Sequence, residues 1–175
     1  MALRFLTRPL ARGFATKVPG ARVAAISNTL NRAMLAIDDG CGATYASCFT
    51  KEGRCEVALL GITAEGHTAL AQMAEDLHAR FPDCRHWEGN VCVIEADEPD
   101  EAINRSYWQS LEGGTIVSTG IHYDALEREE GIWKIASRRI LHTWTRKDGH
   151  VPQAAHDWAT HATGVTRKIL TYTSV

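Results

Sequence analysis

Apolar residues at helical spacing dominate the first part of the chain and predict a long helix followed by two short elements. Between Val23 and Ile37 the apolar positions recur every three or four residues, which is the spacing of one buried helix face. Gly40 and Gly42 follow and predict the end of this helix. The next run, residues 43–50, predicts a second short helix, and residues 55–60 predict a brief strand.

A third helix is predicted between Thr63 and Pro82. Thr63 can cap its N-terminus, and Glu65 falls in the first turn, where the positive end of the helix dipole favours a carboxylate. The apolar face continues to Phe81, and Pro82 ends the helix because proline disfavours helical backbone in the residue before it.

After Pro82 the apolar period changes from helical spacing to alternation. Four runs rich in β-branched and aromatic residues are joined by "EP", "GG" and "EEG", which suit hairpin turns. These predicted strands cover residues 86–97, 101–112, 115–129 and 132–146. Helices followed by an antiparallel meander predict an α+β domain in which one face of the sheet packs on the helices.

Length and composition support a single globular domain. A chain of 175 residues with 45% hydrophobic content can bury a full core without disulfides or metals. The formal net charge of −2 provides no field that would attract nucleic acid, so no nucleic-acid partner is expected. No stretch reaches the roughly 20 apolar residues that a membrane helix needs, so no membrane insertion is expected either.

The N-terminal segment differs in charge from the rest of the chain. No acidic residue precedes Asp38, and within residues 1–17 arginines recur at every fourth position. This composition is typical of a transit peptide, and "RGFAT" resembles a processing site that would place cleavage near Phe14 or Ala15. We predict a cleavable leader over residues 1–20 and a location in the mitochondrial matrix. The alternative is a disordered basic tail on a cytoplasmic protein.

Five cysteines, an odd number without a C-x-x-C pair, argue against a disulfide framework. Cys41, Cys48 and Cys55 recur every seven residues, but Gly42 and Gly53 interrupt the segment, so one helix cannot present all three on one face. We expect free, mostly buried thiols and a reducing compartment.

The last segment, residues 147–175, is predicted to be a polar tail that could form one short helix. It is rich in histidine, but His150, His156 and His161 have no acidic ligands at useful spacing. We therefore expect no metal site and no cofactor.

Three motifs carry a family resemblance. "FTKEG" is similar to an "F-x-x-D/E-G" motif after a second helix, and "FPDCRHWEGN" is similar to "F-P-x-x-x-H-x-x-x-N" at a strand entry. "HYDALEREEGIWKIASRRI" is similar to the closing motif "Y-x-D-x-L-x-R-x-x-G-x-W-x-I-x-x-R". These motifs resemble those of SnoaL-like proteins in the nuclear transport factor 2-like superfamily. The likeness covers residues 22–146 and implies a cone-shaped, curved, mixed or antiparallel sheet packed on three N-terminal helices.

The resemblance implies a general base at His86, oriented by a carboxylate from the end of the first helix. Asp38 fits the family spacing better than its neighbour Asp39. Histidine suits this role because its unperturbed pKa of about 6.5 lets it accept and return a proton near neutrality. The family tyrosine five residues before the aspartate is Ala33 here, which argues against tyrosine-assisted dehydration. Alternatively, His86 bonds a backbone carbonyl at the strand entry, and the aspartates merely end the helix.

His122 is the second candidate for acid/base chemistry. Strand alternation places Ser118, Gly120, His122 and Asp124 on one face of the predicted strand over residues 115–129. The resemblance puts His122 at a polar pocket position, as a second acid/base group or a substrate anchor. A β-bulge would instead turn this histidine toward solvent.

Three further residues are predicted to bind substrate. Trp108 is expected to face the cavity, where an indole suits a hydrophobic or aromatic ligand. Tyr45 is the nearest phenol that could reach the mouth of the cone. Arg138 is expected to hold a carboxylate at the rim, with an exposed ion pair on the sheet as its alternative.

These features predict a metal-free dehydratase, isomerase or cyclase that acts by histidine acid/base chemistry on a small hydrophobic or aromatic molecule. The alternative is a non-catalytic ligand-binding or dimerisation module with the same fold, because one fold hosts many functions. In either case we expect a homodimer formed through the open face of the sheet.

Overall fold

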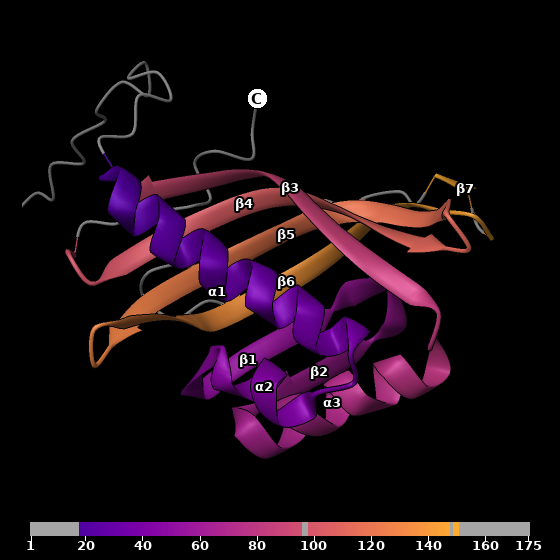
Figure 1. Cartoon of the computed structure of the whole chain (residues 1–175), viewed down its shortest axis with the longest axis horizontal. Helices are drawn as coiled ribbons and strands as arrows, with labels where there is room; N and C mark the ends of the chain where they lie inside the picture. The colour runs from indigo at the N-terminus through magenta and orange to yellow at the C-terminus, as the bar shows by residue number, and fades with distance from the viewer. Residues whose placement is uncertain (1–17, 96–97, 148, 151–175) are drawn as a thin grey trace, which may run out of the picture.

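The computed structural model describes residues 18–95, 98–147 and 149–150. Within them, helices come first and long strands follow (Figure 1). The elements in chain order are α1 (Gly20–Asp38), α2 (Gly42–Ser47), β1 (Phe49–Val57), the 3₁₀ turn η1 (Ala58–Leu60), β2 (Ile62–Glu65), α3 (Gly66–Arg80), β3 (Cys84–Glu95), β4 (Glu101–Glu112), β5 (Thr115–Glu129), β6 (Ile132–Thr145) and β7 (Gly149–His150). This order confirms the predicted α+β class.

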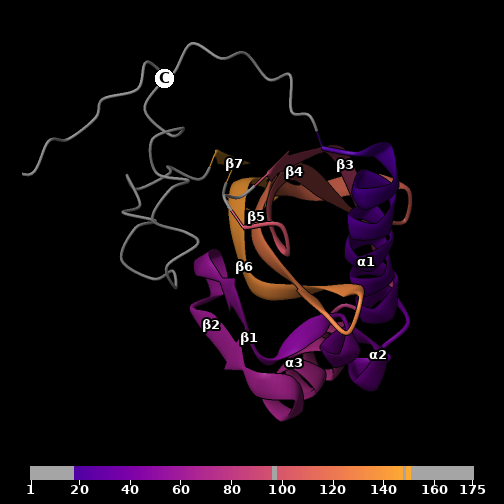
Figure 2. The same cartoon turned by 90° about the vertical axis from the view of Figure 1, so that its left-hand side faces the viewer.

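The strands form one mixed sheet in the order β2-β1-β6-β5-β4-β3, with β7 paired to β6. β1 runs parallel to β6, and the other neighbouring strands are antiparallel. The sheet curls strongly, and α1 lies across its hollow side (Figure 2). The curved sheet on three helices expected from the motif resemblance is therefore confirmed.

Helix α1 closes the hollow side of the sheet with an apolar face. Ile26, Leu30, Ala33 and Ile37 recur at helical spacing on this face, and each is buried. The Thr29 hydroxyl donates to the Trp133 carbonyl at 2.9 Å, which ties the helix to β6. These contacts fix the end of α1 beside the sheet.

A tight turn ends α1 and sets the position of its last residue. Gly40 adopts a left-handed φ of 65°, and a Cβ there would lie 2.6 Å from the His78 ring of α3. Glycine is thus required both for the backbone conformation and for the close approach of α3. The turn holds Asp38, which is buried, against the inner edge of the sheet.

The prediction for residues 43–60 was partly wrong. The short helix ends at Ser47, and the strand begins at Phe49 rather than at residue 55. The cause is a long-range contact, since the Ile135 amide of β6 donates to the Cys48 carbonyl at 2.9 Å and Phe49 pairs with Ile135. Residues 58–60 form η1 instead of continuing the strand.

The prediction that Thr63 caps the third helix was also wrong. Thr63 belongs to β2 and pairs with Glu56 of β1, and α3 begins at Gly66 after Glu65. Strand pairing overrides the capping propensity of threonine here. The four strand predictions that follow are confirmed to within two residues at each end.

The predicted leader, residues 1–20, and the predicted tail, residues 147–175, lie almost wholly outside the described residues. Both remain predictions, as do the cleavage site near Phe14 or Ala15 and the short helix in the tail. Among the described helices, none is long and apolar enough to cross a bilayer.

Candidate functional site

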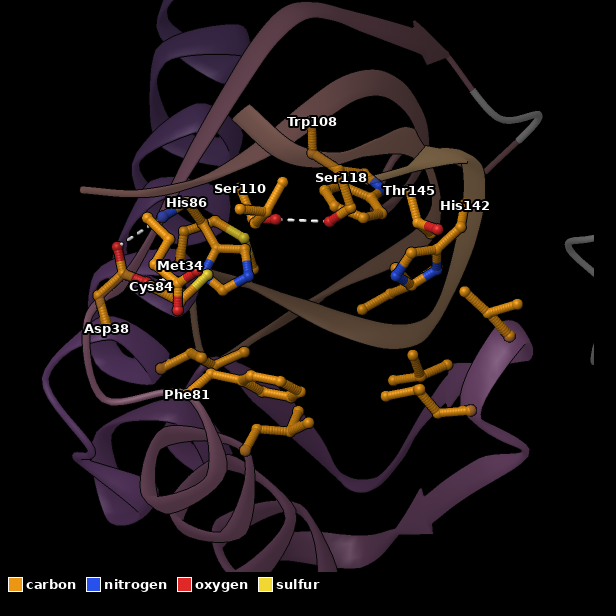
Figure 3. Close-up of a pocket in the computed structure, with 18 of the residues that line it drawn as sticks. Met34, Asp38, Phe81, Cys84, His86, Trp108, Ser110, Ser118, His142 and Thr145 are labelled. Carbon is orange, nitrogen blue, oxygen red and sulfur yellow. Dashed lines mark hydrogen bonds and ion pairs between the residues drawn. The ribbon is translucent and has the colours of Figure 1, made fainter. Parts of the chain in front are cut away.

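The closest polar contact at the inner end of α1 joins Asp38 to His86 of β3. His86 Nδ1 lies 2.6 Å from Asp38 Oδ1, and the His86 backbone N–H donates to Asp38 Oδ2 at 2.9 Å (Figure 3). One carboxylate therefore fixes both the ring and the backbone of His86. Asp39, the neighbour, is exposed. The contact expected between the end of the first helix and His86 is present, and it is made by Asp38.

His86 opens onto a cavity of about 550 Å³ enclosed by the curled sheet and the helices. The His86 side chain is 24% exposed, while its partner Asp38 is 6% exposed. The walls of the cavity are mainly apolar, and its volume is typical of small-molecule sites. Wall residues include Met34, Ile37, Val57, Leu59, Leu60, Leu77, Phe81, Val117 and Ile140, with Glu112, Arg146 and Lys147 among the polar ones.

Trp108 faces this cavity, as predicted, and three histidines surround its ring. His122 stacks on the indole with ring centroids 5.7 Å apart, and His142 meets its edge at 4.8 Å. His86 lies farther away, at 6.5 Å. Gly120 makes room for the indole, because a Cβ at that position would lie 2.5 Å from Trp108 Cζ2. The sheet thus brings three imidazoles to one aromatic wall.

His122 points into the protein and is 2% exposed, so the alternative that a bulge turns it toward solvent is wrong. The Nδ1 atom of His122 lies 3.4 Å from Oε1 of Glu88, which is a residue of β3. Glu88 also accepts a short hydrogen bond from Ser106 and lies 3.7 Å from the Arg138 guanidinium. Arg138 in turn donates to Asp124 at 2.7 Å. A buried ionic network therefore lies behind His122.

The network sets the charges of its members. Burial acts to raise the pKa of Glu88, but the attraction of Arg138 and His122 outweighs it and lowers that pKa to about 2. Burial lowers the pKa of His122 below its ordinary value and Arg138 adds to this, while Glu88 and Asp124 oppose it. At neutral pH the site therefore holds a carboxylate beside a neutral imidazole.

His142 of β6 is a third histidine in the cavity wall. Burial, followed by repulsion from His122 and His86, lowers its pKa to about 4. The two neighbouring rings therefore act on His142 electrostatically, and His142 is neutral at physiological pH.

Two of the predicted substrate-binding residues do not line the cavity. Arg138 is 1% exposed and held by Asp124 and Glu88, so both the rim position and the exposed ion pair predicted for it are wrong. Tyr45 is fully buried, and its hydroxyl donates to Cys55 Sγ at 3.4 Å, so it does not reach the mouth of the cone. Ala33 is likewise buried in the core.

Sequence reasoning missed Glu88, His142 and Ser110, and it placed Ser118 on the face of His122 without giving it a role. Glu88 lies two residues after His86, so strand alternation alone places its side chain on the same inner face. His142 lies four residues after Arg138 on β6 with no register shift between them, so alternation places both side chains on the same face. The two serine hydroxyls lie 2.5 Å apart in the wall, a contact across strands that has no local signal.

The prediction of free, mostly buried thiols is confirmed in part. All five cysteines are free, with Cys48 and Cys55 buried, Cys84 and Cys92 half-buried and Cys41 exposed. Fewer are buried than predicted.

Residues 21–139 match the family model of the SnoaL-like domain, and the chain belongs to that family. A search of curated proteins gave no match. Among solved structures, a variant of Rv3472, a protein of unknown function from Mycobacterium tuberculosis, is 24% identical, with a TM-score of 0.65 over 87% of this chain and 86% of that one.

Two further solved structures share the fold. A putative scytalone dehydratase from Novosphingobium aromaticivorans is 23% identical, with a TM-score of 0.64 over 77% of this chain and 91% of that one. A hexachlorocyclohexane dehydrochlorinase, LinA-type3 from Novosphingobium barchaimii, is 18% identical, with a TM-score of 0.63 over 75% of this chain and 95% of that one. The chain thus shares the fold of these proteins.

Proposed function

We propose that this protein is a metal-free lyase or isomerase that removes a proton from a small hydrophobic or aromatic molecule. His86 is the general base, Asp38 orients it, and His122 is the second acid/base group or the substrate anchor. The contact between Asp38 and His86 at the wall of an open, mainly apolar cavity carries this proposal.

The geometry of this pair gives His86 a defined protonation. The carboxylate accepts at 2.6 Å from Nδ1, so the ring proton resides on Nδ1 and the lone pair on Nε2. Within the described part of the chain, no hydrogen bond occupies Nε2 of His86. A ligand proton in the cavity can therefore be taken by Nε2, and the imidazolium that forms is stabilised by Asp38.

In an elimination, Nε2 takes the proton from the carbon next to a carbonyl group, and the electrons of that C–H bond form a C=C bond. The bond from the neighbouring carbon to its hydroxyl oxygen breaks, and the leaving hydroxide takes a proton from the imidazolium and departs as water. In an isomerisation, the imidazolium returns the proton to a different carbon. Neither reaction changes the oxidation state of the substrate as a whole.

The serine pair supports these reactions in the absence of the family tyrosine. One hydroxyl hydrogen is used in the bond between Ser110 and Ser118, which leaves the hydrogen of the other hydroxyl to donate to a ligand carbonyl. Such a donor stabilises the negative charge that develops on the carbonyl oxygen when the proton is removed.

A dehydration assay tests this function. The probe is the aldol adduct of benzaldehyde and acetone, a β-hydroxyketone whose dehydration gives the ultraviolet-absorbing enone benzalacetone. We expect turnover by the wild type and a loss of about 10²–10⁴ in kcat/KM for His86→Gln, the usual contribution of a general base. Asp38→Asn is expected to lower the rate as well, because an amide nitrogen at this position can donate to Nδ1 and leave the proton on Nε2.

His67→Gln is the matched control, because His67 bonds the Phe49 carbonyl at 3.1 Å and is not part of the cavity wall. It should keep the wild-type rate. Equal rates for His86→Gln and wild type would contradict the role of His86. No turnover of any β-hydroxyketone or aryl ketone by the wild type would favour the non-catalytic ligand-binding alternative.

We also propose that two copies associate through the outer face of the sheet. Trp87 and Tyr107 are 64% and 46% exposed, and alternation places them on the face opposite His86 and Trp108. Sedimentation of the wild type and of Tyr107→Glu tests this association. A monomeric wild type would contradict it.

A further inference from the structure

Behind His122 the structure builds a second contact between a carboxylate and a histidine. His122 of β5 and Glu88 of β3 are 2% and 9% exposed, and Glu88 Oε1 lies 3.4 Å from His122 Nδ1. The contact resembles that of Asp38 with His86 in its chemistry, but it lies deeper and on different strands.

Several groups hold the Glu88 carboxylate in place. Ser106 donates to Oε1, Arg138 lies 3.7 Å from Oε2, and Asn104 donates to both Ser106 and Asp124. Arg138 is itself fixed by two hydrogen bonds to Asp124, at 2.7 and 3.2 Å. The carboxylate therefore cannot turn away from His122 without breaking this network.

The position of the carboxylate decides where His122 carries its proton. A lone pair on Nδ1 would face a negatively charged oxygen at 3.4 Å inside a buried site, which is strongly unfavourable. The proton on Nδ1 removes this repulsion and leaves the lone pair on Nε2. Nε2 is on the far side of the ring from Glu88, and the His122 side chain lines the cavity.

We propose that Glu88 is a positioning residue that keeps the His122 proton on Nδ1, so that Nε2 of His122 accepts a hydrogen bond from a hydroxyl group of the ligand. The ligand class is then a neutral ring compound with a hydroxyl donor, placed against Trp108. This inference rests on the proposed function, since it assigns His122 the role of substrate anchor beside the base His86.

The protonation of His122 can be measured directly in the wild-type protein. ¹⁵N-edited NMR of the histidine rings distinguishes protonated from unprotonated ring nitrogens, and the spectrum of His122→Phe identifies the signals that belong to His122. We expect a protonated Nδ1 and an unprotonated Nε2 at neutral pH. A protonated Nε2 would overturn the proposal, whether or not any variant folds.

The variant Glu88→Gln tests the cause of this protonation. An amide can donate to Nδ1, so we expect signals of the other tautomer, with its proton on Nε2, to appear. Glu127→Gln is the control. Glu127 lies near the C-terminal end of β5, five residues after His122, so this substitution should leave the His122 signals unchanged. An unchanged tautomer in a folded Glu88→Gln protein would show that Glu88 does not position the ring.

The ligand class is tested with β-naphthol and its methyl ether, which have the same ring but differ in the hydroxyl donor. We expect β-naphthol to bind the wild type about three- to tenfold more tightly, the factor that one hydrogen bond usually contributes. The preference should be lost in His122→Phe, which keeps an aromatic ring against Trp108. Equal binding of both probes, binding of neither, or a preference that survives in His122→Phe would overturn the predicted ligand class.

The experiments distinguish a failure of the proposal about Glu88 and His122 from a failure of the proposed function. If Nε2 of His122 does not accept a hydrogen bond from the ligand, His86→Gln should still lose the dehydration activity. If His86 is not a base, the tautomer of His122 and the hydroxyl preference remain.

Discussion

His142 offers a quantitative test of the electrostatics in the cavity. Its ring is partly buried in the wall, and the combined effect of burial and of repulsion from His122 and His86 lowers its pKa from 6.5 to about 4. In the unfolded chain the same imidazole binds a proton near its ordinary pKa. Between these two values the unfolded state therefore binds more protons than the folded state, and the free energy of unfolding falls as the pH is lowered.

The size of the effect follows from the two pKa values. One pKa unit corresponds to about 1.4 kcal/mol, so His142 alone should lower the free energy of unfolding by about 2 kcal/mol at pH 5 and by about 3 kcal/mol at pH 4, relative to pH 7. His122, whose pKa is also lowered, contributes in the same direction. The contribution of His142 is therefore taken from the difference between wild type and His142→Gln.

Urea unfolding at several pH values between 7 and 4 measures this difference. The wild type should lose stability faster than His142→Gln as the pH falls, with unchanged m-values. Parallel curves for the two proteins would refute the reasoning. So would an NMR titration in which the His142 ring takes up its proton near pH 6.5, because the ring would then not be shielded from water.

Two further substitutions test the packing of the site. Gly120→Ala should displace Trp108 and destabilise the protein by about 1–3 kcal/mol or more, because the new Cβ would lie 1.9 Å from the Leu141 carbonyl oxygen, whereas Gly89→Ala, which meets no atom within 4 Å, should have little effect. Near-ultraviolet circular dichroism and thermal unfolding report both changes, and an unperturbed Gly120→Ala protein would contradict the close contact. Arg138→Met should cost about 3–5 kcal/mol in chemical unfolding, because it leaves Asp124 and Glu88 as unpaired buried charges. Arg54→Met, which removes only surface pairs at 3.9 and 4.0 Å, should cost no more than about 1 kcal/mol, and equal losses would contradict the buried network.

The parts of the fold that were predictable from the sequence are those in which one local pattern persists over many residues. The spacing of Ile26, Leu30 and Ile37 predicted α1, and alternation bounded by "GG" and "EEG" predicted β4, β5 and β6 almost to the residue. β1 and β2 were mispredicted because β1 depends on pairing with β6, which is far away in the sequence, and β2 in turn pairs with β1. Local propensity, such as that of Thr63 for a helix cap, has little weight against such pairing.

In the candidate site, too, some contacts could be predicted from the sequence and others depend on pairing between distant strands. The Asp38 and His86 contact was predicted because the motif resemblance fixes both ends of it. Arg138 was expected at the rim because arginine is usually exposed, but the structure neutralises it with two buried carboxylates, and neither pairing can be read from one strand. His142 was missed because Arg138, which is four residues away on the same unbroken stretch of β6, was itself expected at the rim and not inside the cone.

Proton removal by His86 can be measured without the subsequent elimination. Benzylacetone has the ketone of the dehydration probe but no leaving group, so in D₂O the enzyme can only exchange the protons next to its carbonyl for deuterium, which ¹H NMR follows. The wild type and His67→Gln should catalyse this exchange, and His86→Gln should slow it by at least about 100-fold. Exchange at the wild-type rate in His86→Gln would contradict the assignment of His86, oriented by Asp38, as the base of this cavity.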